Sequence, residues 1–447
     1  YPGIRSDSDM YTLGYAFRPW LERKAIADGP AILKYVRETA ADYGVDRKIR
    51  FRHRVVQAAW SSADARWTVE AVGPAGEPVR LTCGFLFMCS GYYDYDAGYT
   101  PDFPGMETFK GTFVHPQHWP QDLDYAGKKV VIIGSGATAV TLAPAMARIA
   151  GHVTMLQRSP TYVVSRPAVD PIALAFQRWL PQSWAYSATR WKNVLFGMYF
   201  FRLCRRSPDK VKAFILNQLR EHLPAETVAR HFTPTYNPWD QRLCLVPDAD
   251  LFEAIKDERV TVVTDHIDTF TETGLLLKSG QTLDAEVIVS ATGLVLKVLG
   301  GMSVIVDGAP VDFAKTTNYK GMMYSDVPNL ASVFGYTNAS WTLKADLTCE
   351  YVCRLLNKME REGLRQCTPR MADPAMPREP WIDFSSGYFQ RALDRFPKQG
   401  ARAPWRLHQN YALDLMDLRF GSVDTEMSFT AAPARAAAPA DHTTPAA

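Results

Sequence analysis

The stretch KKVVIIGSGATAVTLAPAMA, residues 128–147, contains an apolar run, a glycine-rich turn and a helix-forming segment, in that order. The turn has the pattern G-x-G-x-x-A and directly follows the strand-like residues 130–133. This order of strand, turn and helix is the context in which such a turn binds the diphosphate of a dinucleotide. The stretch therefore predicts an α/β fold with a Rossmann-like nucleotide-binding unit.

Each position of the turn has a physical role. Gly134 permits the tight turn, Gly136 lets the backbone approach a diphosphate, and Ala139 keeps the helix close to the strand. The start of the helix offers unpaired N–H groups and the positive end of its dipole to the phosphates. The predicted cofactor-binding residues of the turn are Gly134, Ser135, Gly136, Ala137, Thr138, Ala139 and Val140.

The next apolar run, HVTMLQRSP, discriminates between the two nicotinamide dinucleotides. A site for NAD would place Asp or Glu about 20 residues after the first glycine, where it binds the ribose 2′-hydroxyl. Gln157 and Arg158 stand there instead, and a guanidinium pairs with a 2′-phosphate. The sequence therefore predicts NADPH, with Gln157 and Arg158 among its binding residues. The alternative is that Arg158 is an ordinary surface arginine of a loop.

The composition excludes several other classes of protein. The chain has 447 residues, 47% of them hydrophobic, which is enough for two or three packed units. Its 50 basic and 47 acidic residues leave a net charge of +3, too small for a nucleic-acid binder. The seven cysteines include no Cys-x-x-Cys pair and no cluster with histidine, so we expect buried thiols, no metal site and no redox dithiol. We recognise no secretory leader and no apolar run of the roughly 18 to 20 residues that span a membrane, and we expect a cytoplasmic location.

The rest of the chain divides into segments of different character. Residues 49–72 alternate as two paired strands around a polar turn, and residues 81–95 predict one buried strand that ends at Gly91. Residues 167–231 have helical periodicity, whereas residues 259–294 predict short strands separated by glycine turns. The helical segment is expected to pack over an active site, and contact with a membrane surface is the less favoured alternative.

A second motif precedes the glycine turn. Phe109, Gly111, His115 and Trp119 follow the spacing F-x-G-x-x-x-H-x-x-x-W. This motif resembles the fingerprint of the type I Baeyer–Villiger monooxygenases, which are flavoproteins with separate FAD and NADPH domains. The stretches YNPWDQRLCLVPDADLF and GYTNASWTLKADL are similar to the ethionamide-activating branch of that family. The family begins with its own G-x-G-x-x-G unit for FAD, and this chain, which opens with YPGIRSDSDMYT, is expected to start after it.

The resemblance implies the fold class and the order of the domains. It implies an α/β protein with two Rossmann-like dinucleotide-binding domains, one for FAD and one for NADPH, and a helical insertion. The FAD domain is expected in residues 1–118 and 291–430, the NADPH domain in 119–166 and 237–290, the insertion in 167–236, and a disordered tail in 431–447.

The resemblance also implies an activity. The family inserts one oxygen atom of O2 beside the carbonyl of a ketone to give an ester, or oxidises the sulfur of thioethers and thioamides, by way of a C4a-peroxyflavin. Arg242 matches the arginine that stabilises this anionic peroxide, and Asp7 matches the carboxylate that orients the arginine. His115 is expected to couple the position of NADP to the state of the flavin rather than to transfer a proton. Further cofactor contacts are implied at Arg5, Ser6, Asp7 and Val55.

Two other functions stay open at this level. A flavin monooxygenase that oxygenates only nitrogen or sulfur would share the NADPH turn, although Arg242 together with Trp119 favours the Baeyer–Villiger reaction. A non-catalytic NADPH-binding fragment is the second alternative, because the FAD turn is missing from the sequence as given. The flavin content of the purified protein would separate this second alternative from the enzymes.

Overall fold

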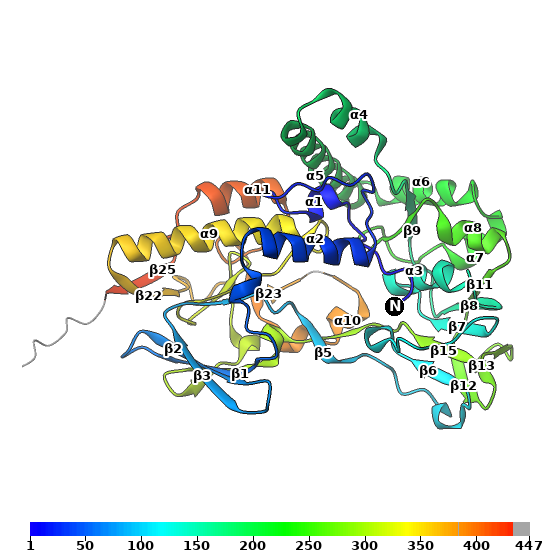
Figure 1. The fold of residues 1–447 in the computed structure, drawn as a ribbon, viewed down its shortest axis with the longest axis horizontal. Helices are drawn as coiled ribbons and strands as arrows, with labels where there is room; N and C mark the ends of the chain where they lie inside the picture. Colours follow the sequence, from blue (N-terminus) through cyan, green and yellow to red (C-terminus); the bar gives the residue numbers. More distant parts are fainter. Residues whose placement is uncertain (383, 432–447) are drawn as a thin grey trace, which may run out of the picture.

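The computed structural model describes residues 1–382 and 384–431 and has an α/β architecture (Figure 1). Five strands between residues 112 and 290 form a parallel sheet on the right of Figure 1, whereas β1–β3 and the long helix α9 lie on the left. A helical hairpin stands above both parts. The predicted tail lies outside the described residues from position 432 onward.

A five-stranded parallel sheet holds the glycine turn. The order of its strands is β11-β8-β7-β15-β6, and every pair is parallel. Parallel neighbours require a crossover connection between them. Between β7 and β8 this connection is the helix α3 (Ala137–Met146). The strands are β6 (Thr112–Val114), β7 (Lys129–Ile133), β8 (His152–Gln157), β11 (Val260–Thr264) and β15 (Val287–Ser290).

Both faces of this sheet are covered, which explains the unbroken apolar sequence of β7. Val130 and Ile132 pack into a core formed with α3, α6 (Pro208–Arg220) and α8 (Asp250–Lys256). Val131 and Ile133 pack on the other side, against the antiparallel strands β12 (Ile267–Thr271), β13 (Gly274–Leu277) and β14 (Thr282–Asp284). The short strands predicted over residues 259–294 are confirmed.

A second sheet confirms the paired strands predicted over residues 49–72. β1 (Arg54–Ser61) and β2 (Arg66–Val72) are antiparallel, and the order of the sheet is β18-β17-β1-β2-β3. Trp60 and Trp67, which face each other across the pair, are buried in the core beneath it. The other members are β3 (Pro78–Cys83), β17 (Ser303–Val306) and β18 (Ala309–Pro310).

The single buried strand predicted over residues 81–95 is wrong. The chain there forms the end of β3, then β4 (Leu86–Met88) and β5 (Tyr93–Gly98), which belong to three different sheets. β4 pairs in parallel with β21 (Leu330–Ser332), and β5 pairs with β16 (Leu294–Leu296). Gly84 and Gly91 interrupt the run, and the apolar residues of β4 are only half-buried.

Helices cover the left-hand part of the molecule. The longest, α9 (Trp341–Arg361), packs its apolar face on a core that contains Tyr319 and Trp405. Near its start, Lys344 forms a buried ion pair with Asp414, with 2.9 Å between Nζ and Oδ2. The other helices here are α1 (Met10–Leu13), α2 (Gly29–Asp42), α10 (Gly387–Gln390) and α11 (Tyr411–Leu415).

The remaining strands form two-stranded sheets, β9 with β10, β19 with β20, β22 with β25 and β23 with β24. They are β9 (Val163–Arg166), β10 (Cys244–Pro247), β19 (Asn318–Tyr319), β20 (Met323–Tyr324), β22 (Leu364–Pro369), β23 (Arg378–Pro380), β24 (Lys398–Gly400) and β25 (Met427–Ala431).

The insertion predicted over residues 167–236 is built mainly from four helices. It contains α4 (Pro171–Trp179), α5 (Gln182–Arg206), α6 and α7 (Ala225–His231). Arg190 fixes α5 to the body, because its Nη1 donates to the carbonyls of Tyr11 and Gly14 at 2.9 and 2.8 Å. Its Nη2 pairs with Asp346 of α9 at 3.1 Å. The division of the chain into domains stays a prediction. Because β6 belongs to the parallel sheet, the unit that contains this sheet begins before residue 119.

The cysteines are free thiols, as predicted, but they are not all buried. Cys204, Cys244 and Cys367 lie in the core, whereas Cys89, Cys349 and Cys353 are exposed. Cys349 and Cys353 lie one turn apart on α9, so they share one face of that helix. The prediction of buried thiols is therefore wrong for these three.

Candidate active site

The glycine turn is shaped to receive a ligand from one side only. Gly134 has φ +136°, and an added Cβ atom would lie 2.4 Å from the carbonyl oxygen of Ala291. A Cβ atom on Gly136, by contrast, would meet no atom of the described chain within 4 Å. Gly136 also precedes α3 without a side-chain cap, so the first N–H groups of the helix are free for an anion. These features fit the diphosphate of a dinucleotide.

The two residues predicted to recognise the 2′-phosphate, Gln157 and Arg158, differ in exposure. Gln157 is buried at the end of β8, and its Nε2 donates to the carbonyl of His231 at 2.7 Å and to Thr264 Oγ1 at 2.8 Å. Arg158 is exposed and forms no ion pair with any of the described residues. The amide of Gln157 thus stabilises the sheet, and Arg158 is the residue left available to a phosphate.

Asp7 and Arg242 meet as predicted, although 235 positions separate them in the sequence. Arg242 Nη2 lies 2.8 Å from Asp7 Oδ2, and about a third of each side chain stays exposed. Burial alone would lower the pKa of Arg242, but Asp7 and the hydroxyls of Tyr388, Tyr92 and Tyr93 raise it above its usual value. The guanidinium is therefore a fixed positive charge.

This ion pair faces a cavity of about 710 Å³. One wall is apolar and comes from α5, which contributes Val194, Met198 and Phe201. Asp7, in the loop before α1, and Arg242, in the segment before β10, also line the cavity. The helical insertion therefore packs over the Arg242–Asp7 pair, as predicted.

Four other charged groups of the cavity have contacts of their own, whereas Arg202 forms no ion pair among the described residues. Asp170 caps α4 and pairs with Lys192, and Asp9 accepts a hydrogen bond from Asn193 Nδ2 at 2.8 Å. Arg166 packs its guanidinium on the ring of Phe196, 5.1 Å from the ring centre. These contacts fix the polar rim of the cavity and leave the Arg242 pair facing its apolar wall.

His115 lies in the linker that follows β6, between two strands of the parallel sheet, and both of its ring nitrogens are engaged. Nδ1 accepts from the backbone N–H of Gln117 at 3.2 Å, so Nε2 carries the proton and donates to the carbonyl of Gly293 at 3.1 Å. Burial lowers the pKa of His115, and the bond to Gly293 opposes this only in part. The ring is thus neutral and joins the linker to the segment that follows β15.

Three further predicted residues lie in different surroundings. Arg5 pairs with Asp250 at the start of α8, and its second contact, from Nη2 to Oδ1, is 3.2 Å long. Ser6 donates its backbone N–H to the carbonyl of Ala27 at 2.9 Å. Both contacts hold the loop that carries Asp7. Val55 lies in β1 and is 40% exposed, and its contact with FAD stays a prediction.

The sequence analysis missed a group of tyrosines beside Arg242. The hydroxyls of Tyr92 and Tyr93 lie 2.7 Å apart, and burial raises the pKa of Tyr388, which reaches the same place from α10. Tyr92 stacks on Trp341, with ring centres 4.8 Å apart. The run GYYDY appeared only as part of a strand, and nothing in the spacing of Tyr388 marks it, so only the fold brings these rings together.

The site combines a turn open to a diphosphate, at the carboxyl edge of a parallel sheet, with a fixed cation on a nearby apolar cavity. These features fit an oxidoreductase that uses a nucleotide cofactor. A family model described as flavin-binding monooxygenase-like matches residues 25–298, which is more than half of the chain. The chain belongs to this flavin-binding monooxygenase-like family.

Curated relatives agree with this assignment. The chain is 55% identical over 428 residues to the FAD-containing monooxygenase EthA of Mycobacterium tuberculosis, and the match covers 95% of this chain and 87% of that protein. It is 49% identical over 441 residues to the putative FAD-containing monooxygenase MymA of the same species, covering 97% and 89%. The predicted resemblance and the predicted class, a flavoprotein monooxygenase, are confirmed.

Solved structures of the same fold confirm the predicted fold class. A cyclohexanone monooxygenase bound to ε-caprolactone matches with a TM-score of 0.70 at 19% identity, covering 96% of this chain and 91% of that chain. OTEMO in complex with FAD and NADP matches with a TM-score of 0.67 at 22% identity, covering 83% and 79%. The predicted cofactors, FAD and NADPH, agree with the groups named for these proteins.

Proposed function

We propose that this protein is an FAD- and NADPH-dependent monooxygenase that converts ketones into esters and oxidises the sulfur of thioethers and thioamides. In the first reaction one ketone, one O2, one NADPH and one proton give one ester, one NADP⁺ and one water. The observation that carries the proposal is the Arg242–Asp7 ion pair, which places a permanent cation on the wall of an apolar cavity.

NADPH is the electron donor in this proposal. The open side of Gly136 and the free N–H groups of α3 receive its diphosphate, and the exposed Arg158 pairs with its 2′-phosphate. The seven residues of the turn, from Gly134 to Val140, form this diphosphate site. Because NADPH is a cytoplasmic reductant, its use supports the predicted cytoplasmic location.

Flavin, when bound, supplies the activation of O2 at the expense of NADPH. The chain supplies Arg242, whose guanidinium stabilises the negative charge that develops on the reacting oxygen. Arginine suits this task because it stays protonated and donates in a rigid, planar fork. Asp7 orients that fork, and the contacts of Arg5 and Ser6 hold the loop of Asp7 in place. The apolar residues of α5 keep water away from the charge.

His115 is a positioning residue in this mechanism. Its neutral ring bridges Gln117 and Gly293, which follow the first and the last strand of the parallel sheet along the chain, β6 and β15. No ring nitrogen is left to take a proton from a substrate. The bridge instead couples the linker to the segment beside the glycine turn, so a shift of the nicotinamide cofactor would reach the flavin side through it.

The purified protein tests the proposal directly. We expect a flavin absorption spectrum that NADPH bleaches. With phenylacetone as the ketone, one equivalent of ester should form for each NADPH consumed in air. Oxidation of a thioether without any ester from ketones would show an oxygenase of nitrogen or sulfur instead. Binding of NADP⁺ without flavin would show a nucleotide-binding protein rather than this enzyme.

A further inference from the structure

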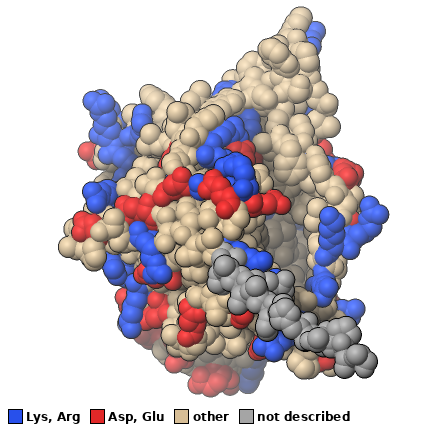
Figure 2. Space-filling view, turned by 90° about the vertical axis from the view of Figure 1, so that its left-hand side faces the viewer, with Lys and Arg blue, Asp and Glu red and all other residues tan. Residues whose placement is uncertain are grey.

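The hairpin formed by α4 and α5 projects from the body of the molecule. It is the highest part of Figure 1, and in Figure 2 the highest part of the surface is almost entirely free of charged side chains. Its tip is the turn from Arg178 to Trp184. Trp179 and Trp184 are 77% and 70% exposed there, although tryptophan is among the side chains that gain most from burial.

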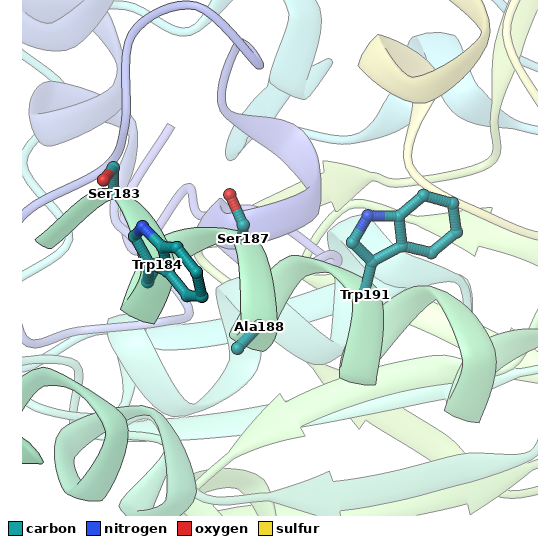
Figure 3. Close-up of a pocket in the computed structure, with 5 residues that line it drawn as sticks. All are labelled: Ser183, Trp184, Ser187, Ala188 and Trp191. Atoms are coloured by element: carbon teal, nitrogen blue, oxygen red, sulfur yellow. The ribbon is translucent and has the colours of Figure 1, made fainter. Parts of the chain in front are cut away.

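The exposed apolar side chains continue down one side of α5. Trp184, Trp191, Leu195 and Tyr199 are spaced by seven, four and four residues, so they form one stripe on the helix. A hollow of about 430 Å³ lies along the start of this stripe, lined by Ser183, Trp184, Ser187, Ala188 and Trp191 (Figure 3). The opposite side of α5, which includes Asn193, Gly197 and Phe200, lines the cavity of the Arg242 pair. Trp191 packs on Tyr411 of α11, with ring centres 5.7 Å apart, whereas Trp184, Leu195 and Tyr199 are each more than half exposed. The stripe is therefore a second apolar face that the fold leaves largely open.

The charge of the hairpin is of one sign. Residues 171–206 contain six basic side chains and no Asp or Glu. Arg190, Lys192 and Arg205 pair with carboxylates of other segments. The other three, Arg178, Arg202 and Arg206, form no ion pair among the described residues, and Arg178 packs on the ring of Trp179 at 5.3 Å. Arg202 lines the cavity of the Arg242 pair and Arg206 is the last residue of α5, so Arg178 is the unpaired cation at the tip. The tip thus presents aromatic side chains, one unpaired positive charge and no carboxylate.

We infer that the α4–α5 hairpin docks on the surface of a bilayer that contains anionic phospholipids, with Trp179 and Trp184 entering the headgroup region. Tryptophan prefers this region because its ring is apolar and its N–H needs a polar partner. Basic side chains at the surface are attracted to anionic lipids, whereas an acidic one would be repelled. No helix among the described residues is long and apolar enough to cross a membrane, so the contact is peripheral.

Docking in this way would bring the cavity, which lies on the other side of α5 from the stripe, close to the lipid surface. Under the proposed function, an apolar ketone or sulfide dissolved in the bilayer would then lie close to its site of oxidation. The binding of lipid itself does not depend on that function, and it is measured without any turnover.

Sedimentation with vesicles tests the inference on the full chain. We expect the protein to pellet with vesicles of equal parts phosphatidylcholine and phosphatidylglycerol, and at least about tenfold less with phosphatidylcholine alone. The double variant Trp179→Ser/Trp184→Ser should lose at least about tenfold of the binding to anionic vesicles, since each indole buries a large apolar surface. The variant Arg178→Gln should lose less, and added salt should weaken binding of the wild-type protein.

Phe51→Ser is the matched control, because Phe51 is 67% exposed but lies outside the hairpin. This control should bind vesicles as the wild type does, and all variants should keep the wild-type melting temperature and affinity for NADP⁺. Failure of the wild type to pellet with anionic vesicles would overturn the inference, as would equal binding by the double tryptophan variant. A wild-type oligomer that the double variant converts to monomers without lipid would show that the hairpin joins copies of this chain, and would also overturn it.

Discussion

The nucleotide turn and the Arg242 pair differ in how the chain builds them. The turn, its strand and its helix occupy fewer than 20 consecutive residues, Lys129–Met146, and Arg158, which we propose to bind the 2′-phosphate, directly follows the next strand, β8. The Arg242 pair instead joins a loop near the start of the chain to the segment before β10, with Tyr388 added from α10. The turn therefore depends mainly on local structure, whereas the pair depends on the packing of segments that lie far apart in the chain.

The largest effect is expected from a change that weakens the packing around the Arg242 pair. In the variant Lys344→Met, Asp414 would remain buried without its cation, and Tyr336, whose hydroxyl donates to Asp414 at 2.6 Å, would stay bound to an unpaired charge. We expect a loss of about 3–5 kcal/mol in the free energy of unfolding, measured by urea denaturation. The double variant Lys344→Met/Asp414→Asn should recover part of the loss. Unchanged stability of the single variant would show that the ion pair does not support this region.

The second prediction concerns Arg242 itself. Arg242→Ala should lower the rate of ester formation by about 10²–10³-fold, because a preorganised cation is removed from the reacting oxygen. Reduction of the flavin by NADPH, followed by stopped-flow absorbance, should stay close to the wild-type rate. Arg202→Ala is the control, since Arg202 lines the same cavity without pairing with Asp7. Retained ester yield in Arg242→Ala would exclude the assigned role.

A change at the proposed nucleotide site should have a smaller effect. Arg158→Ala should weaken the binding of NADP⁺ by about 10- to 100-fold, because a charge-assisted bond to the 2′-phosphate is lost. Binding of NAD⁺, which lacks this phosphate, should not change. Arg148→Ala, at an exposed position after α3, should leave both affinities unaltered. Calorimetric titration measures both, and an equal loss for the two nucleotides would show that Arg158 does not recognise the phosphate.

The smallest expected effect is a pH dependence at the linker. Burial lowers the pKa of His115 below its ordinary value of 6.5, so the unfolded chain binds the proton more readily than the folded one. The stability that this neutral ring contributes is present above pH 6.5 and is lost as the pH falls through the folded pKa. The melting temperature of His115→Gln should therefore fall less than that of the wild type when the pH is lowered from neutral to 5. Parallel curves for both proteins would contradict this assignment.

The two regions also differ in how much the sequence predicted. The parallel sheet and turn were predictable because the physical reasons are local: a buried strand, a left-handed glycine at position 134 and a helix start with free N–H groups. The burial of Gln157 was not, since it depends on Thr264 and on the carbonyl of His231, which lie far along the chain.

The Arg242 pair was predicted from a resemblance and not from spacing. The fold then added the cavity and the three tyrosines, which no local pattern marked. The predicted strand over residues 81–95 failed for a related reason, because Gly84 and Gly91 allow one apolar run to enter three sheets. Long-range packing therefore accounts for most of what the sequence did not predict.

The insertion of oxygen is tested most directly by turnover of phenylacetone under ¹⁸O2. We predict an ester that carries one labelled oxygen atom beside the original carbonyl, with the second labelled atom in water, and loss of this labelled ester in Arg242→Ala. An ester without label, or a protein that consumes NADPH and O2 without forming any ester, would contradict the proposed reaction.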